Sequence, residues 1–133
     1  MAAMTDSRQP EKIRVLLAED NADLRITITM LLADEPDMDC VASTGVLADV
    51  ASLADQHDAQ VVILDLQLQG GSALPVLPGL RTARPQTAFL IHSGHSNPGI
   101  VQAAHEAGAS AYVLKTGDIE LLLAAIRKAV RAK

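Results

Sequence analysis

Apolar and polar residues follow one another along the chain in a pattern that predicts strands and helices in turn. Five short runs rich in Val, Ile, Leu and Ala have the length and composition of β-strands; they cover residues 13–18, 38–42, 61–64, 87–91 and 111–114. After each of them apolar residues recur at helical spacing, over residues 22–33, 46–54, 73–83, 99–107 and 118–132. The pattern therefore predicts five consecutive β-α units.

Strands that are separated by helices run parallel, and right-handed crossovers place the helices on both faces of the sheet. This predicts an α/β, (βα)5 doubly wound fold. The run VVIL at 61–64 has no polar residue, which is typical of a central strand buried on both faces. Pro75 and Pro78 fall where the third helix should begin, so we expect that helix to start late, not before Leu77. Gly108 is a natural stop for the fourth helix.

Polar side chains follow four of the five predicted strands. Glu19 and Asp20 follow the first, Asp65 the third, Ser93 the fourth and Lys115 the fifth. Because the carboxyl ends of parallel strands share one edge, where α/β proteins bind ligands, these groups should converge. Two carboxylates ~4 Å apart repel each other by about 4 kcal/mol at an effective dielectric near 20. The repulsion among three carboxylates is therefore more than the single charge of Lys115 can offset.

A divalent cation removes that repulsion, and Mg²⁺ suits hard oxygen ligands that leave room for water and a phosphate. A carboxylate beside Mg²⁺, with a hydroxyl and an ammonium opposite, is arranged to accept a phosphoryl group, with Asp65 as the nucleophile. Simpler roles stay open. Glu19 and Asp20 also suit the first turn of the next helix, and Ser93 suits an ordinary turn. Tyr112 suits packing against the fourth helix.

Composition narrows the function. The chain has 133 residues, which fits one domain, and a net charge of −5 with no basic block, which argues against nucleic-acid binding by this chain itself. No apolar run approaches the ~20 residues that span a membrane. The single cysteine, Cys40, fits a cytoplasmic protein without an internal disulfide. We expect residues 1–11 to form a disordered leader and residues 12–133 to form the folded domain.

Four motifs carry a resemblance to a known family: LLAEDN (16–21), VVILDLQL (61–68), FLIHSGH (89–95) and AYVLKT (111–116). In this order, at strand ends, they resemble the receiver domain of bacterial two-component response regulators over residues 12–132. The likeness is greatest to the NarL/LuxR-type subgroup. The resemblance implies a flavodoxin-like sheet of order 2-1-3-4-5 and a phosphorylation-dependent signalling switch rather than an enzyme.

The resemblance also implies a role for each residue of the metal and phosphoryl site. Asp65 matches the phosphoacceptor, and Asp20 matches a direct Mg²⁺ ligand. Glu19 matches its acidic neighbour, which acts partly through water. The backbone carbonyl of Gln67 would complete the metal contacts. Lys115 matches the lysine that pairs with the phosphoacceptor.

Two further positions match the family's switch. Ser93 matches the hydroxyl that turns toward the phosphoryl group, and Tyr112 matches the aromatic residue that moves inward with it. Gln67 and His95 match the two variable positions that tune the phosphoryl lifetime. His92 and His95 lie close in sequence, but strand alternation and the lack of further ligands argue against a zinc site.

The chain departs from the family at two positions. Gln69 stands where proline is usual, four residues after Asp65, and Thr116 replaces the proline that usually follows the lysine, so the geometry of that peptide is open. A haloacid-dehalogenase-like phosphatase is an alternative, although such enzymes need an acid where Gln67 stands. A receiver-like module without phosphorylation is another.

The family also implies a partner, a sensor histidine kinase or phosphotransfer protein. Separately, Leu121, Ala124 and Ala125 make the apolar stripe of the last helix broader than one sheet face needs. This fits either a generously apolar packed helix or a homodimer or partner surface involving the first and last helices. Whether a DNA-binding domain follows Lys133 is not decided by these residues.

Overall fold

The computed structural model describes residues 11–95 and 97–132. Nearly all of the predicted leader, residues 1–11, therefore lies outside the described residues. The main sheet has five parallel strands: β1 (Ile13–Ala18), β2 (Met38–Thr44), β3 (Val61–Leu64), β6 (Ala88–Ser93) and β7 (Ala111–Leu114). Their order is β2-β1-β3-β6-β7, which confirms the predicted order 2-1-3-4-5.

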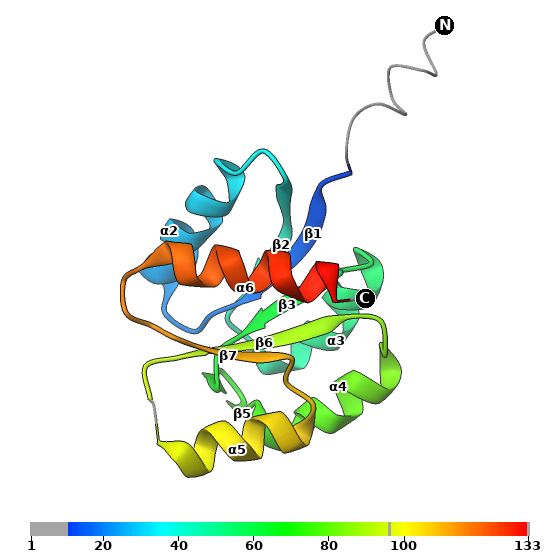
Figure 1. The fold of residues 1–133 in the computed structure, drawn as a ribbon. Coiled ribbons are helices and arrows are strands. Elements are labelled where there is room, and N and C mark those ends of the chain that lie inside the picture. Colours follow the sequence, from blue (N-terminus) through cyan, green and yellow to red (C-terminus); the bar gives the residue numbers. More distant parts are fainter. Residues whose placement is uncertain (1–10, 96, 133) are drawn as a thin grey trace, which may run out of the picture.

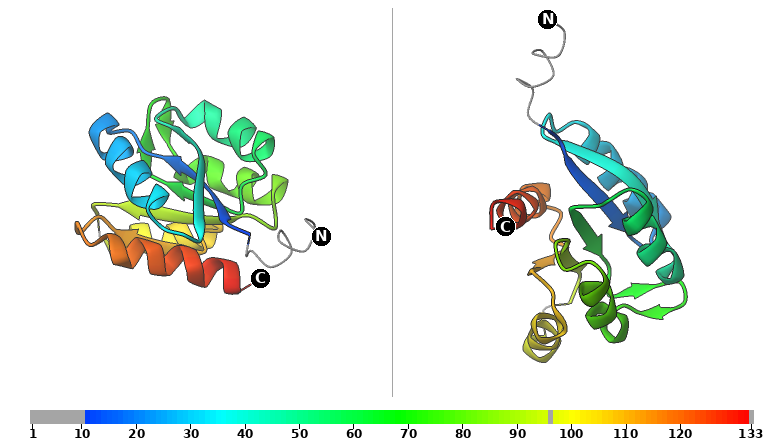
Figure 2. Two further views of the ribbon diagram at one scale, coloured as in Figure 1. Left: turned by 90° about the horizontal axis from the view of Figure 1, so that it is seen from above. Right: turned by 90° about the vertical axis from the view of Figure 1, so that its right-hand side faces the viewer.

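Five α-helices cover the two faces of this sheet: α2 (Ala22–Ala33), α3 (Val50–Gln56), α4 (Leu77–Ala83), α5 (Pro98–Ala107) and α6 (Ile119–Arg131). Figures 1 and 2 show α2 and α6 on one face and α3, α4 and α5 on the other. Each side has its own apolar core, with Phe89 buried under α3 to α5 and Leu90 buried under α2 and α6. The doubly wound α/β fold is confirmed.

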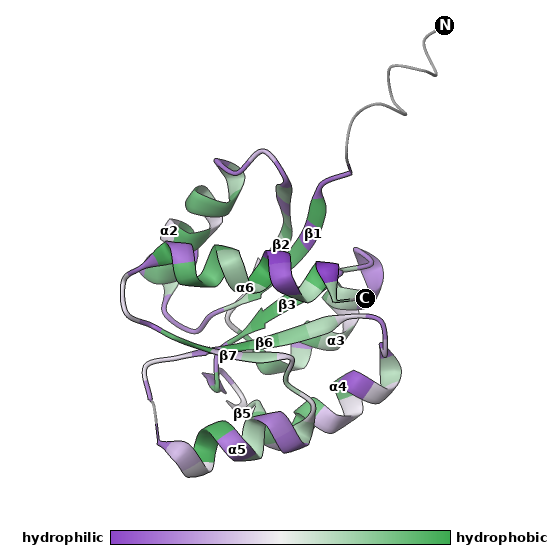
Figure 3. Ribbon diagram, viewed as in Figure 1, coloured by the Kyte–Doolittle hydropathy of each residue, from purple (hydrophilic) through white to green (hydrophobic). Residues whose placement is uncertain are grey.

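The strands are apolar because most of them are covered on both faces (Figure 3). All four residues of β3 are buried, as predicted for the central strand. Tertiary burial, rather than a polar-apolar alternation, therefore shapes the sequence of this strand. Within the described residues, every helix is too short or too polar to cross a bilayer.

Helix α4 begins at Leu77, as the two prolines predict, and a short 3₁₀ turn, η2 (Leu74–Val76), precedes it. The second predicted helix, 46–54, is wrong at its start, because a 3₁₀ turn, η1 (Leu47–Asp49), comes before α3. Helix α6 starts one residue later than predicted, because Asp118 caps it: its carboxylate accepts the N–H of Glu120 at 3.0 Å.

The stretch after β3 contains a small hairpin that the hydrophobic pattern did not predict. Its strands, β4 (Gln67–Leu68) and β5 (Gly71–Ser72), pair antiparallel. The Gln69 N–H donates to the Gly45 carbonyl, and the Leu47 N–H donates to the Gln69 carbonyl, both at 2.9 Å. These bonds fix the segment that follows Asp65 to the end of β2.

Candidate functional site

The strand register brings the predicted polar residues to one edge of the sheet. Ala18 pairs with Leu64, and Leu64 pairs with Ile91. The residues that follow these three therefore lie at the same level of the sheet. The backbone ladder continues past the strand ends, since the Asp65 N–H donates to the Ala18 carbonyl at 3.0 Å. The Lys115 N–H likewise donates to the Ser93 carbonyl at 2.8 Å. The main chain therefore holds the edge in a fixed shape.

Lys115 lies between two carboxylates at this edge. Its Nζ is 2.9 Å from Glu19 Oε1 and 3.1 Å from Asp65 Oδ2. Burial lowers the pKa of Lys115, but the hydrogen bonds and charges of Glu19 and Asp65 outweigh it and raise the pKa above its usual value. The ammonium therefore stays charged near neutral pH.

Glu19 is almost completely buried and satisfies two donors. Besides the contact with Lys115, its Oε2 accepts the backbone N–H of Asn21 at 3.0 Å. The helix cap itself is Asn21, whose side chain accepts the Leu24 N–H at 3.0 Å. The carboxylate of Glu19 thus supports the start of α2 and pairs with Lys115 at the same time. Asp20 is exposed.

Among residues 11–95 and 97–132, no three His, Cys, Asp or Glu side chains cluster closely enough to form a metal site. Lys115 bonds to one oxygen of Glu19 and to one oxygen of Asp65. The ion pairs of the described residues leave Asp65 Oδ1 and Asp20 unused. Oδ1 lies 3.5 Å from the Gln67 N–H. Two such acidic groups fit Mg²⁺, which binds through one or two carboxylates and keeps several waters.

Ser93 and Tyr112 both bond to the backbone of His95. The hydroxyl of Ser93, which is buried, accepts the His95 N–H at 3.2 Å. The Tyr112 hydroxyl donates to the His95 carbonyl at 2.7 Å, while its ring packs at the edge of the core under α5. Within the described residues, no hydrogen bond joins Ser93 to Asp65. The loop after β6 therefore connects the two predicted switch side chains.

His92 is a residue whose environment sequence reasoning missed. It is buried, and its Nδ1 has no hydrogen-bond partner among the described residues. Burial, aided by the positive charge of Lys115 and opposed by Asp65, lowers the pKa of His92 to about 4, so its ring is neutral at pH 7. The available signal was its position two residues after Leu90, which places it on the face that α2 and α6 cover, at the end of an apolar run.

Comparison with known proteins identifies the class of protein to which this fold and the polar site at the carboxyl edge of its sheet belong. Residues 15–127 match the family described as the response regulator receiver domain. The chain therefore belongs to the response regulator receiver domain family, whose members are signalling domains and not classical enzymes.

Individual relatives point to the NarL/LuxR type. The chain is similar to the nitrate/nitrite response regulator protein NarP of Escherichia coli K12, with 34% identity over 114 residues that cover 86% of this chain and 53% of NarP. Among solved structures it resembles a LuxR-family DNA-binding response regulator from Staphylococcus aureus (TM-score 0.82, 30% identity, 89% of this chain and 98% of the other). A LuxR-family response regulator from Aurantimonas sp. SI85-9A1 is similar (TM-score 0.85, 25% identity, 92% and 88%). The chain spans about half the length of the curated relatives it matches.

Proposed function

We propose that the chain is a phosphorylation switch in which Asp65 accepts a phosphoryl group from the phosphohistidine of a sensor histidine kinase or a phosphotransfer protein. One observation carries this proposal: the Lys115 ammonium lies 3.1 Å from Asp65 Oδ2, at the carboxyl edge of the central strand. A lysine held beside a carboxylate is suited to neutralise the charge that a transferred phosphoryl group brings.

In the proposed reaction, the free oxygen of Asp65 attacks phosphorus, forming an O–P bond as the P–N bond to the donor histidine breaks. The electron pair of the P–N bond stays on the donor nitrogen, which takes a proton from water to leave as neutral imidazole. Lys115 bonds to a phosphoryl oxygen, while Glu19 keeps the ammonium in place from the buried side. Positioning and charge therefore do most of the catalysis, as in other phosphoryl transfers.

The residues that would hold Mg²⁺ are Asp20 and Asp65 through their side chains, Gln67 through its backbone carbonyl and Glu19 through water. When bound, the cation supplies further positive charge at the phosphoryl oxygens. The two acidic groups that the ion pairs leave unused, Asp20 and Asp65 Oδ1, support this assignment.

The phosphoryl group would then shift the loop after β6. Ser93 exchanges its bond to His95 for one to a phosphoryl oxygen, and Tyr112 leaves the His95 carbonyl and moves inward. Both hydrogen bonds involve the backbone of His95. Loss of the bond from the His95 N–H to Ser93 therefore weakens the bond from the Tyr112 hydroxyl to the His95 carbonyl. The result is a changed surface around α5, β7 and α6, with Gln67 and His95 setting how long the phosphoryl group survives.

The changed surface would act on partners. The first and last helices carry exposed apolar side chains, Ile26 and Met30 on α2 and Leu121 on α6, which support a homodimer through α2 and α6. The lengths of the relatives suggest an output carried by a second domain, a DNA-binding transcriptional one, since this acidic chain has no basic block for nucleic acid. On this proposal the protein exchanges its phosphoryl group with a kinase inside the cell and acts in the cytoplasm.

Incubation with acetyl phosphate and Mg²⁺, followed by intact mass measurement, tests the central step. We expect one phosphoryl adduct in the native chain, and none with Asp65→Asn or when a chelator removes Mg²⁺. Asp55→Asn is a matched control, because Asp55 is an exposed aspartate that pairs with Arg84 far from this edge. An adduct that survives Asp65→Asn contradicts the proposal.

Sedimentation of the phosphorylated and unmodified chain tests the dimer. We expect phosphorylation to favour association, and Met30→Ser to weaken it. Val76→Ser, which changes an exposed apolar residue on the other face, should leave it unchanged. Equal effects of the two substitutions contradict the α2–α6 interface.

A further inference from the structure

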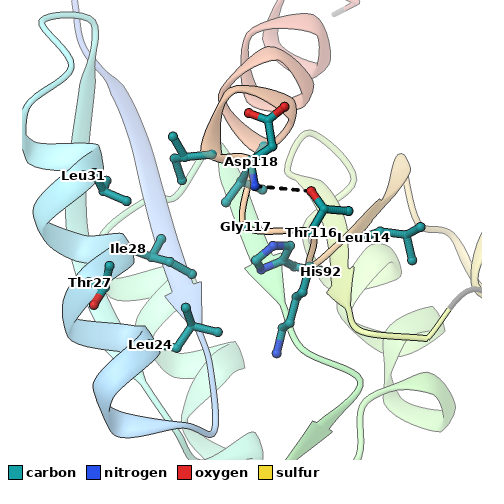
Figure 4. Close-up of a pocket in the computed structure, with 12 residues that line it drawn as sticks. Leu24, Thr27, Ile28, Leu31, His92, Leu114, Thr116, Gly117 and Asp118 are labelled. Atoms are coloured by element: carbon teal, nitrogen blue, oxygen red, sulfur yellow. Dashed lines mark hydrogen bonds between the residues drawn. The ribbon is translucent and has the colours of Figure 1, made fainter.

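A basic side chain of α2 reaches back to the loop that carries the acidic pair. The Arg25 guanidinium donates from Nη1 to the backbone carbonyl of Glu19 at 2.6 Å. Figure 4 shows Leu24 and Ile28 on the side of α2 that faces His92. Successive residues of a helix are rotated by about 100°, so Arg25 points to another side. Its side chain therefore lies at the ends of β1 and β2 rather than in the core under α2.

This hydrogen bond completes the attachment of Glu19, whose two carboxylate oxygens already have partners. The Glu19 N–H donates to the Thr44 carbonyl at 2.9 Å, so both backbone groups of the residue are now held. The carbonyl that Arg25 holds belongs to the peptide unit between Glu19 and Asp20. Because a peptide unit is planar, fixing this carbonyl also fixes the direction in which the main chain enters Asp20.

Gly45, directly after β2, leaves the space that the guanidinium occupies. A Cβ at this position would lie 2.7 Å from Arg25 Nη1 and 3.3 Å from the Glu19 carbonyl oxygen. The first separation is too short for atoms that are not bonded, so a side chain at position 45 would displace the end of the flexible arginine. Three segments, the ends of β1 and β2 and the first turn of α2, thus meet at one carbonyl group.

We propose that Arg25 is a positioning residue for the Mg²⁺ site, because it fixes the main chain from which the Asp20 carboxylate projects. This inference rests on the proposed function, in which Asp20 is a Mg²⁺ ligand. Removal of a group that orients a metal ligand typically lowers metal affinity by about 10–100-fold. The charge of Arg25 acts in the opposite direction, since a nearby cation repels Mg²⁺. Loss of the guanidinium therefore weakens Mg²⁺ binding if position dominates and strengthens it if charge dominates.

Mg²⁺ titrations of the unphosphorylated chain, followed by ¹H–¹⁵N NMR, measure binding without phosphorylation. Arg25→Met keeps an unbranched apolar side chain but cannot donate a hydrogen bond, and it should raise the Kd for Mg²⁺ about tenfold. Gly45→Ala keeps the charge of Arg25 but displaces its guanidinium, so it should raise the Kd as well. It also keeps the test decisive if Arg25→Met does not fold.

The double variant Arg25→Met/Gly45→Ala separates this contact from other effects of the alanine. Its Kd should equal that of Arg25→Met alone, because the alanine then has no guanidinium to displace.

Arg127→Met is the matched control. It removes a guanidinium that bonds to Glu35 and Asp37, just beyond the opposite end of α2. This variant should be less stable in urea than the native chain but should keep the native Kd for Mg²⁺. An arginine that only attached α2 to the sheet would behave in the same way, so the Kd distinguishes a positioning role from a structural one.

A Kd that is unchanged or lower in Arg25→Met would overturn the inference, as would a native Kd in Gly45→Ala or additive effects in the double variant. Each of these results, with saturable Mg²⁺ binding by the native chain, leaves the proposed function intact. A native chain that shows no saturable shifts with Mg²⁺ would overturn both.

Discussion

The buried histidine makes a quantitative prediction about stability in mild acid. In the folded chain the pKa of His92 is about 4, because burial and Lys115 disfavour the charged ring, whereas its usual value is 6.5. Between these two pH values the unfolded chain binds a proton that the folded chain does not. Stability therefore falls as the pH falls from about 7 to about 4. Each unit of pKa difference is worth about 1.4 kcal/mol, so His92 accounts for a loss of about 3 kcal/mol.

Urea unfolding measures the contribution of His92 to the free energy of unfolding. The native chain and His92→Leu are compared at several pH values between 4 and 8. Other acid-sensitive groups, such as Asp37 and Asp58 with their lowered pKa values, are present in both proteins and cancel in the difference. We expect the native chain to lose about 3 kcal/mol more than the variant over this range. Parallel pH profiles, or a His92 ring that titrates near its usual pKa in NMR, would refute the reasoning.

Three substitutions test other parts of the fold by urea unfolding. Phe89→Ala should cost about 3–5 kcal/mol, because Phe89 is fully buried and leaves a cavity; a cost under 1 kcal/mol would contradict that packing. Thr87→Val should cost about 1–3 kcal/mol of the free energy of unfolding. The hydroxyl of the buried Thr87 donates to the Ala59 carbonyl at 2.8 Å and accepts from Arg84 Nε at 3.0 Å. Thr87→Ser keeps a hydroxyl and should recover much of this loss. Gly108→Ala should cost about 1–2 kcal/mol, because φ is +116° and a Cβ would lie 2.6 Å from Arg81 Cγ, whereas Gly79→Ala, in open space within α4, should be neutral or stabilising.

The repeating pattern of the sequence was enough to predict the sheet. Strand β3 is apolar throughout and α6 has a clear apolar face, so both were found near their observed bounds. The late start of α4 followed from the fixed geometry of proline. The β4–β5 hairpin was missed because two-residue strands are shorter than any periodic window, and their pairing depends on backbone bonds to distant residues such as Gly45.

Topology also predicted that Asp65, Glu19 and Lys115 meet, because their strands end at one edge. It did not predict how they share their charges. That Lys115 contacts both carboxylates, and that Glu19 also accepts the Asn21 N–H, depends on rotamers and burial. His92 was missed for a similar reason, since the cost of an unpartnered nitrogen is visible only once its neighbours are placed.

Gln69 stands where the family usually has a proline, four residues after the proposed phosphoacceptor Asp65. The amide hydrogen of Gln69 bonds to the Gly45 carbonyl, and a proline has no such hydrogen to give. A relative with proline there has a stiffer chain at this point but must attach its hairpin to the neighbouring strand by other means. Gln69→Pro should therefore release one of the two backbone bonds that attach the β4–β5 hairpin to the end of β2, while the bond from the Leu47 N–H to the carbonyl of residue 69 can remain.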